Sequence, residues 1–94
     1  MLLTWVDGVA ADTVPANDRG LQYADGAFET LLCCEGCIQH EGLHRGRLTR
    51  ALTALGVTSA AEQSEHLFVS AGQCLEIARH TGVARLTVTR GSGP

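Results

Sequence analysis

The sequence contains no lysine, and all seven of its basic residues are arginines. A Schiff base with the carbonyl group of a cofactor or substrate requires a side-chain amine, and only lysine supplies one. No side chain of this chain can therefore form such a bond, whatever else the chain binds.

Several other features are scarce or missing. Aromatic residues make up only 4% of the chain, proline occurs twice, and the formal net charge is -3. No apolar run approaches the length of a membrane span, and the first five residues lack the basic region of a secretory signal. A net negative charge argues against a nucleic-acid groove or an anionic membrane surface. We therefore expect a cytoplasmic protein that binds neither nucleic acid nor membrane.

The four cysteines raise the question of a metal site or a disulfide. Without a secretory signal, reduced thiols are expected instead of a disulfide framework. Cys34, Cys37, His40 and His44 have spacings that zinc ligands can show. However, Glu35-Gly36 is typical of a hairpin turn, so Cys34 and Cys37 are more simply interpreted as strand residues beside it. A zinc-binding module stays open as an alternative, but no metal ligand is assigned.

The first half of the chain has the pattern of short strands and turns. Asp7-Gly8 predicts a hairpin between Leu2–Val6 and Val9–Ala11. Asp18 is placed to cap a single helical turn that ends at Tyr23. The run from 27 to 34 is largely apolar on both faces, as in a central strand, and the chain then turns back over 37–39.

The second half changes to a helical period. One helix is predicted from about Leu43 to Leu55, with Gly56 as its C-terminal glycine. A second helix, capped by Ser59 or Ser64, is predicted to stop at Gly82, and a strand follows over 83–89. Residues 1–94 therefore predict one α+β domain, a two-layer sandwich of a mainly antiparallel sheet with two helices on one face.

The candidate site residues gather around the segment Asp18–Leu31, where turn residues precede a buried strand. Within it, Glu29 lies in an apolar strand, where an ionised carboxylate needs a partner such as an arginine. A buried ion pair is favoured over a catalytic acid. His44 is expected to be a packing or capping group.

A cluster of three arginines and the separate Arg90 can each be interpreted either as an anion-binding site or as a solvated surface. Arg45, Arg47 and Arg50 lie near the start of the first predicted helix, and Arg90 precedes Gly91-Ser92-Gly93. The planar guanidinium suits phosphate and carboxylate groups, but such residues often form only a solvated surface. The residues alone favour the solvated surface for the helix arginines.

The segment Asp18–Leu31 resembles the class IV aminotransferase-like family of pyridoxal phosphate enzymes, also called fold type IV. Three further stretches agree in order and spacing: Thr4–Gly8, His44–Leu48 with Leu55-Gly56 after it, and Val88–Gly93. Phe28-Glu29-Thr30 is most similar to the lyase branch, which acts on 4-amino-4-deoxychorismate. A D-amino-acid or branched-chain aminotransferase of the same family is the alternative.

The resemblance implies roles for individual residues. Arg47 would bind the phosphate of the cofactor, Tyr23 and Phe28 would line the substrate pocket, and Arg90 would help to hold a substrate carboxylate. No catalytic residue is implied within this chain. Ala24 stands where the family often has glycine, and the cysteines at 33, 34 and 37 lie in a hairpin that usually carries none.

The resemblance also implies a larger parent protein. The family's Schiff-base lysine lies in a C-terminal domain, so we interpret residues 1–94 as the N-terminal small domain of a two-domain, homodimeric enzyme. The parent would convert 4-amino-4-deoxychorismate to p-aminobenzoate and pyruvate in folate biosynthesis. This chain alone is expected to be inactive and to hold no covalently bound cofactor. A non-catalytic dimerisation module is an alternative of another class.

Overall fold

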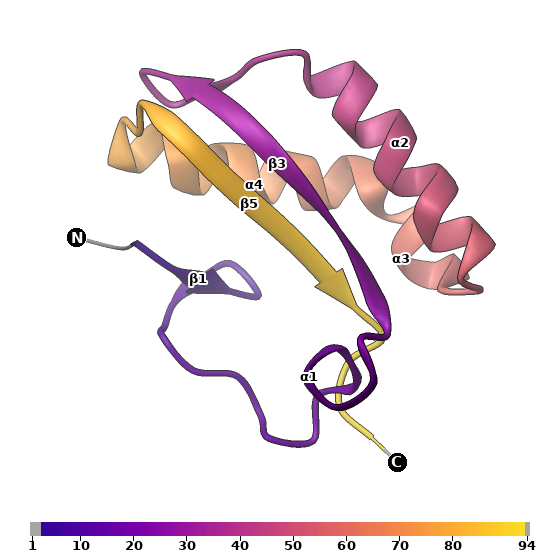
Figure 1. Ribbon diagram of the computed structural model, residues 1–94. Coiled ribbons are helices and arrows are strands. Elements are labelled where there is room, and N and C mark those ends of the chain that lie inside the picture. The colour runs from indigo at the N-terminus through magenta and orange to yellow at the C-terminus, as the bar shows by residue number, and fades with distance from the viewer. Residues whose placement is uncertain (1–2, 94) are drawn as a thin grey trace.

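The computed structural model describes residues 3–93 as an α+β domain with an antiparallel sheet and helices packed against it (Figure 1). The elements are β1 (Trp5–Val6), β2 (Val9–Ala10), α1 (Arg19–Tyr23), β3 (Gly26–Cys34), β4 (Cys37–Ile38), α2 (Glu41–Ala54), α3 (Thr58–Glu62), α4 (Ser64–Ala78) and β5 (Gly82–Thr89). In the sheet, β3 lies between β4 and β5, while β1 and β2 form a separate hairpin.

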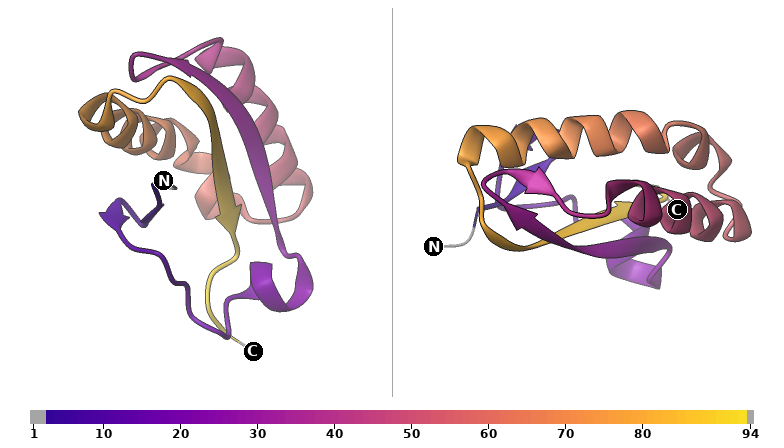
Figure 2. Two further views of the ribbon diagram at one scale, coloured as in Figure 1. Left: turned by 60° about the vertical axis from the view of Figure 1, so that its left-hand side comes forward. Right: turned by 90° about the horizontal axis from the view of Figure 1, so that it is seen from above.

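The pairing of β3 with β5 forms the main part of the sheet. The two strands run antiparallel in an unbroken register from Gly26 opposite Thr89 to Cys33 opposite Gly82. Helix α4 lies across one face of this pair, and α2 runs beside β3 (Figures 1 and 2). The start of β3 and the end of β5 therefore meet at one end of the sheet, where α1 also lies.

Local turn chemistry explains most element boundaries. Both hairpin turns, Asp7-Gly8 and Glu35-Gly36, have positive φ at both central residues, as a type I′ turn requires. At the end of α2, Gly56 has a φ of +76°, the left-handed conformation that glycine adopts without steric cost. The Gly56 N–H donates to the carbonyl of Thr53 and the Val57 N–H to that of Leu52, which closes the helix in a Schellman motif.

The prediction of two helices after the strand pair is wrong in the number of helices and in where the second one begins and ends. The second helical region is divided into the short α3 and the longer α4. Neither serine acts as a cap, because the N-cap positions are Val57 and Gln63 and no side chain caps either helix. The Ser64 hydroxyl is instead hydrogen bonded to the hydroxyl of Thr49 on α2 at 2.7 Å. Gly82 does not stop the helix either, since α4 ends at Ala78 with a left-handed Arg79, and Gly82 begins β5.

The core lies between β3 and the helices. Its fully buried side chains are Leu31 and Cys33 from β3, Leu48 and Leu52 from α2, and Phe68 from α4. Burying apolar side chains of this size stabilises the fold by about 1.5–3 kcal/mol each.

Strand β3 is buried on one face only, contrary to the expectation of two apolar, covered faces. Its residues alternate between buried positions and exposed ones. On the uncovered face, Phe28 is 53% exposed, Leu32 59%, and Val83 of β5 66%. The covering helices all come from the segment after β4, and none of the elements within residues 3–93 covers the other face.

Candidate functional site

The turn that leads into β3 is held by Asp18, as the sequence predicts. Asp18 caps α1, because its Oδ1 accepts a hydrogen bond of 2.8 Å from the Gly20 N–H. Its other carboxylate oxygen accepts from the hydroxyl of Thr89 at the end of β5, at 3.1 Å. One carboxylate therefore joins the N-terminal turn to the C-terminal strand.

Asp25, directly before β3, holds two arginines. Its Oδ2 accepts hydrogen bonds from Arg90 Nε at 2.6 Å and from Arg19 Nε at 2.9 Å. The Arg90 guanidinium, together with that of Arg19, holds the pKa of the Asp25 carboxyl below its usual value. Asp25 thus stays ionised and links the start of β3 to the segment after β5.

Arg90 also reaches the end of α2. Its Nη2 donates to the carbonyl of Leu55 at 2.7 Å and its Nη1 to that of Gly56 at 3.4 Å. These carbonyls lie at a helix C-terminus, where free acceptors and the helix dipole favour a cation. Most of the donors of Arg90 therefore serve the fold, although its side chain is still 38% exposed.

Glu29 has the buried ion pair that the sequence predicts. Its carboxylate lies on the core-facing side of β3, and the residue is only 6% exposed. Arg47 on α2 donates from Nε to both carboxylate oxygens at 3.0 and 3.1 Å and from Nη2 to Oε1 at 2.7 Å. The Arg47 guanidinium is the main reason that the pKa of Glu29 is lowered, and Glu29 in turn raises the pKa of Arg47.

His44 is the second partner of Glu29, one helical turn before Arg47. Its Nδ1 lies 2.7 Å from Glu29 Oε1. An ionised carboxylate only accepts, so this contact requires that Nδ1 carries the proton. The prediction that His44 caps the helix is wrong, because His40 occupies the N-cap of α2. His44 is instead hydrogen bonded to Glu29 on β3.

Arg47 keeps part of its guanidinium free. Glu29 takes the side edge formed by Nε and Nη2, while Nη1 makes no hydrogen bond to any residue from 3 to 93. The side chain is 63% exposed. On the end-on edge formed by Nη1 and Nη2, Nη1 is thus available to a ligand, while Nη2 donates to Glu29, lies 3.3 Å from His44 Nδ1 and has a second N–H to offer.

The two aromatic candidates lie on the surface, each against an arginine. Tyr23 is 64% exposed, with the Arg19 guanidinium 4.9 Å from its ring centre. Phe28 lies on the uncovered face of β3, where the Arg85 guanidinium is 3.9 Å from its ring centre. Neither ring belongs to the core, which leaves both available to contacts outside this chain.

The structure brings the candidate residues together in two groups and not in one pocket. Arg90 and Tyr23 lie at the α1 end of the sheet, where Arg90 contacts Asp25 and Tyr23 contacts Arg19, the second partner of Asp25. Arg47 lies on the helix side with Glu29, whereas Phe28 points to the opposite face of the sheet.

Sequence reasoning missed Asp25 as the centre of the first group. The available signal was an acidic residue in a turn, six residues after one arginine. Its second partner, Arg90, is too distant in sequence for any local pattern to show.

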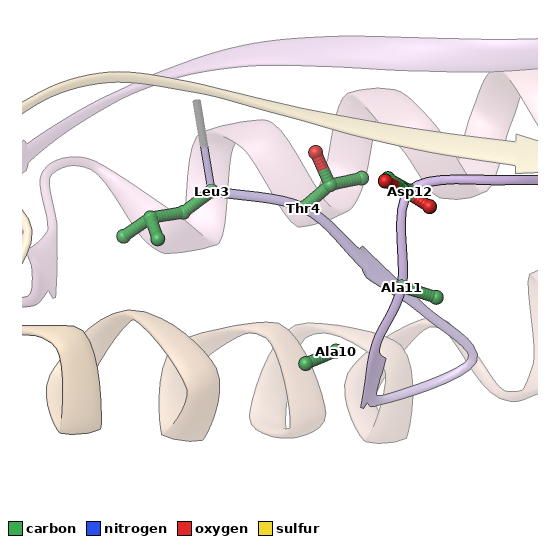
Figure 3. Close-up of a pocket in the computed structure, with 5 residues that line it drawn as sticks. All are labelled: Leu3, Thr4, Ala10, Ala11 and Asp12. Atoms are coloured by element: carbon green, nitrogen blue, oxygen red, sulfur yellow. The ribbon is translucent and has the colours of Figure 1, made fainter. Parts of the chain in front are cut away.

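No other feature suggests a ligand site on the described residues. One hollow is lined by Glu35, Glu76, Arg79 and Thr81. Another lies at the N-terminal hairpin and is lined by Leu3, Thr4, Ala10, Ala11 and Asp12 (Figure 3). Over residues 3–93, no three His, Cys, Asp or Glu side chains are grouped so that they could hold a metal ion. The zinc-module alternative thus has no support there.

The same part of the chain contains no helix that is both long and apolar enough to cross a membrane.

Comparison with known proteins assigns the chain to a family, although no protein-family model matches it. The chain belongs to the fold type IV aminotransferase and aminodeoxychorismate lyase family and matches the N-terminal portion of its members. It is similar to the crystal structure of 4-amino-4-deoxychorismate lyase from Pseudomonas aeruginosa, with a TM-score of 0.86 and 34% identity over 96% of this chain and 32% of that one.

Two further relatives agree with this assignment. A fold IV-transaminase from Curtobacterium pusillum is similar with a TM-score of 0.64 and 30% identity, over 89% of this chain and 32% of that one. The aminodeoxychorismate lyase of Vibrio harveyi is 38% identical over 53 residues, which are 56% of this chain and 20% of that protein. The chain therefore spans about a third or less of the length of these relatives. Both the expected family and the expected α+β fold are confirmed.

Proposed function

We propose that this chain is the N-terminal part of a 4-amino-4-deoxychorismate lyase, which forms p-aminobenzoate and pyruvate in folate biosynthesis. The observation that carries the proposal is the likeness to the lyase from Pseudomonas aeruginosa across 96% of the chain, at a TM-score of 0.86. The transaminase from Curtobacterium pusillum is less similar, at 0.64. The similarity of Phe28-Glu29-Thr30 to the lyase branch supports the same choice.

The proposed cofactor is pyridoxal 5'-phosphate, which supplies an electron sink for carbanion chemistry when bound. The structure offers a fit for its phosphate, since Nη1 of Arg47 makes no hydrogen bond to residues 3–93 and the side chain is 63% exposed. A guanidinium edge binds two phosphate oxygens through parallel N–H groups.

The proposed substrate contacts are Arg90 and Tyr23 at the α1 end of the sheet and Phe28 on the uncovered face of β3. Tyr23 and Phe28 would form apolar walls, because both rings are more than half exposed. Arg90 would use its remaining N–H groups for a substrate carboxylate. Its contacts to Asp25 and Leu55 hold the guanidinium in place for this role.

The covalent chemistry must come from outside this chain. No lysine is present, so the Schiff-base amine would belong to a C-terminal domain of the parent protein. The proposal accordingly includes a cytoplasmic homodimer of a longer chain, in which residues 1–94 supply the phosphate anchor and part of the pocket wall. The 94-residue chain alone should have no activity.

The proposal is tested with the parent protein that contains this chain. It should release p-aminobenzoate and pyruvate from 4-amino-4-deoxychorismate and should not transfer an amino group from D-alanine to 2-oxoglutarate. Transaminase activity without lyase activity would replace the proposal by its runner-up in the same family. Arg47→Ala should raise the cofactor concentration needed for activity, whereas Arg50→Ala, an exposed residue on the same helix, should not.

A further inference from the structure

The carboxylate of Glu29 is hydrogen bonded to two side chains of α2. It accepts from Arg47 Nε and Nη2 and from His44 Nδ1 at 2.7 to 3.1 Å. The residue is 6% exposed, so water has little access to these hydrogen bonds. A charge-assisted pair in such surroundings fixes the geometry of both partners.

The consequence for Arg47 is a fixed orientation. A free arginine side chain has many rotamers, and immobilising it costs up to about 2 kcal/mol. Here Glu29 holds the side edge of the guanidinium, Nη1 has no hydrogen-bond partner among residues 3–93, and the side chain as a whole is 63% exposed. The cost of orienting the end-on edge is met when the domain folds and not when a ligand binds.

We infer that Glu29 is a positioning residue, which orients Arg47 so that its end-on edge receives two oxygens of a phosphate monoester. The inference rests on the proposed function only in identifying that phosphate with the cofactor's. Glu29 itself is not proposed to touch the ligand, since its carboxylate lies on the neighbouring edge of the guanidinium, formed by Nε and Nη2.

Simple electrostatics predicts the opposite effect, which makes the inference testable. Glu29 places a negative charge 2.7 Å from Arg47 Nη2. If charge alone mattered, Glu29→Gln would strengthen the binding of an anion, because it removes this charge. If positioning dominates, the same substitution weakens binding, because Arg47 becomes mobile.

The experiment uses the 94-residue chain and inorganic phosphate as the probe. Phosphate is titrated while the Nε–Hε and Nη–H signals of Arg47 are followed by ¹H–¹⁵N NMR. In the wild type, phosphate should shift the Nη signals and leave the Nε–Hε signal in place. Glu29→Gln should weaken phosphate binding by at least about threefold and by up to about thirtyfold, the factor that corresponds to the full rotamer cost of about 2 kcal/mol. Glu29→Asp, which retains the charge, should recover part of this loss.

Two controls separate positioning from a general loss of structure. Glu41→Gln removes a charge from the first turn of the same helix and should leave the phosphate affinity within twofold. Urea unfolding of each variant shows whether it is folded during the titration. If Glu29→Gln does not fold, the wild-type titration decides, because an Nε–Hε shift as large as that of Nη would show that phosphate displaces Glu29.

The inference is overturned if Glu29→Gln binds phosphate as tightly as the wild type or more tightly. It is also overturned if adding about 50 mM phosphate leaves every Arg47 signal of the wild type unchanged. A site that binds phosphate only above this concentration is too weak to support the inference. These results do not depend on the reaction catalysed. A parent protein with transaminase activity would refute the proposed function and leave the role of Glu29 intact.

Discussion

Replacing Gly26 by alanine should destabilise the domain, because the backbone of β5 leaves no room for a Cβ atom at this position of β3. A Cβ atom at Gly26 would lie 2.4 Å from the carbonyl oxygen of Val88 and 2.9 Å from the Cα of Thr89. Real Cβ atoms essentially never come within 3.0 Å of another heavy atom. Both opposing atoms are backbone atoms, so no side chain can rotate to relieve the clash.

The magnitude follows from the pairing around this position. The strands would have to move apart until the distance from the new Cβ atom to the Val88 carbonyl oxygen rises from 2.4 Å to at least 3.0 Å. This shift would occur at the first pair of a continuous ladder. Overpacking of this kind costs about 1–3 kcal/mol. For a domain of this size, that corresponds to a melting temperature lower by about 5–20 °C.

Urea unfolding followed by circular dichroism measures the change, with Gly72→Ala as the matched control. Gly72 lies in the middle of α4, and a Cβ there meets nothing within 4 Å. The control should therefore be more stable than the wild type by about 0.5–1 kcal/mol, the usual gain from alanine in a helix. A Gly26→Ala midpoint equal to that of the wild type, beside a raised Gly72→Ala midpoint, would refute the close approach of the strands.

Four other outcomes are expected. The pKa of Asp25 is lowered by Arg90 and Arg19, so its stabilising effect is complete above the unfolded-state pKa of about 3.9 and is lost as the pH falls through the folded-state value. Asp25→Asn should thus reduce the loss of unfolding free energy as the pH falls below about 4, and an unchanged pH dependence would contradict the ion pairs of Asp25 with Arg90 and Arg19. Leu52→Ala should cost about 2–5 kcal/mol in urea unfolding, while Leu43→Ala, at a 74% exposed position, should change stability by less than about 0.5 kcal/mol. After incubation with pyridoxal phosphate and borohydride, mass spectrometry should find no pyridoxyl group on any side chain; one such group would refute the reasoning from the missing lysine. The uncovered face of β3 and β5 should make the chain self-associate, which sedimentation as a clean monomer would contradict.

The sequence predicts this fold best where a few neighbouring residues decide the backbone. The cap at Asp18, the turn at Glu35-Gly36 and the helix end at Gly56 all follow from contacts within six residues of the chain. The strand over 83–89 follows from β-branched alternation in the same local way. These features required no knowledge of the packing.

The division between α3 and α4 could not be predicted in this way. Ser59 and Ser64 both have the chemistry of a cap, but the position of the break depends on α2. The Ser64 hydroxyl is hydrogen bonded to Thr49, and Ala61 is buried in the core. Likewise, the apolar character of β3 on both faces could not show which face the helices cover, because coverage depends on elements far away in the sequence.

Arg47 and Arg90 show the same limit at the site itself. From the sequence, each could be an anion ligand or a structural cation, and the chemistry of arginine does not separate the two. Their acceptors do. Arg90 donates hydrogen bonds to Asp25 and to the carbonyls at the end of α2, so its first role is to hold the segment after β5 against α2. Arg47 is held by one buried carboxylate along one edge, and its side chain as a whole is exposed. The proposed phosphate site rests on this arrangement of a buried acceptor on one edge and an exposed side chain, and Glu29, interpreted from the sequence as half of an ion pair, is the residue that produces it.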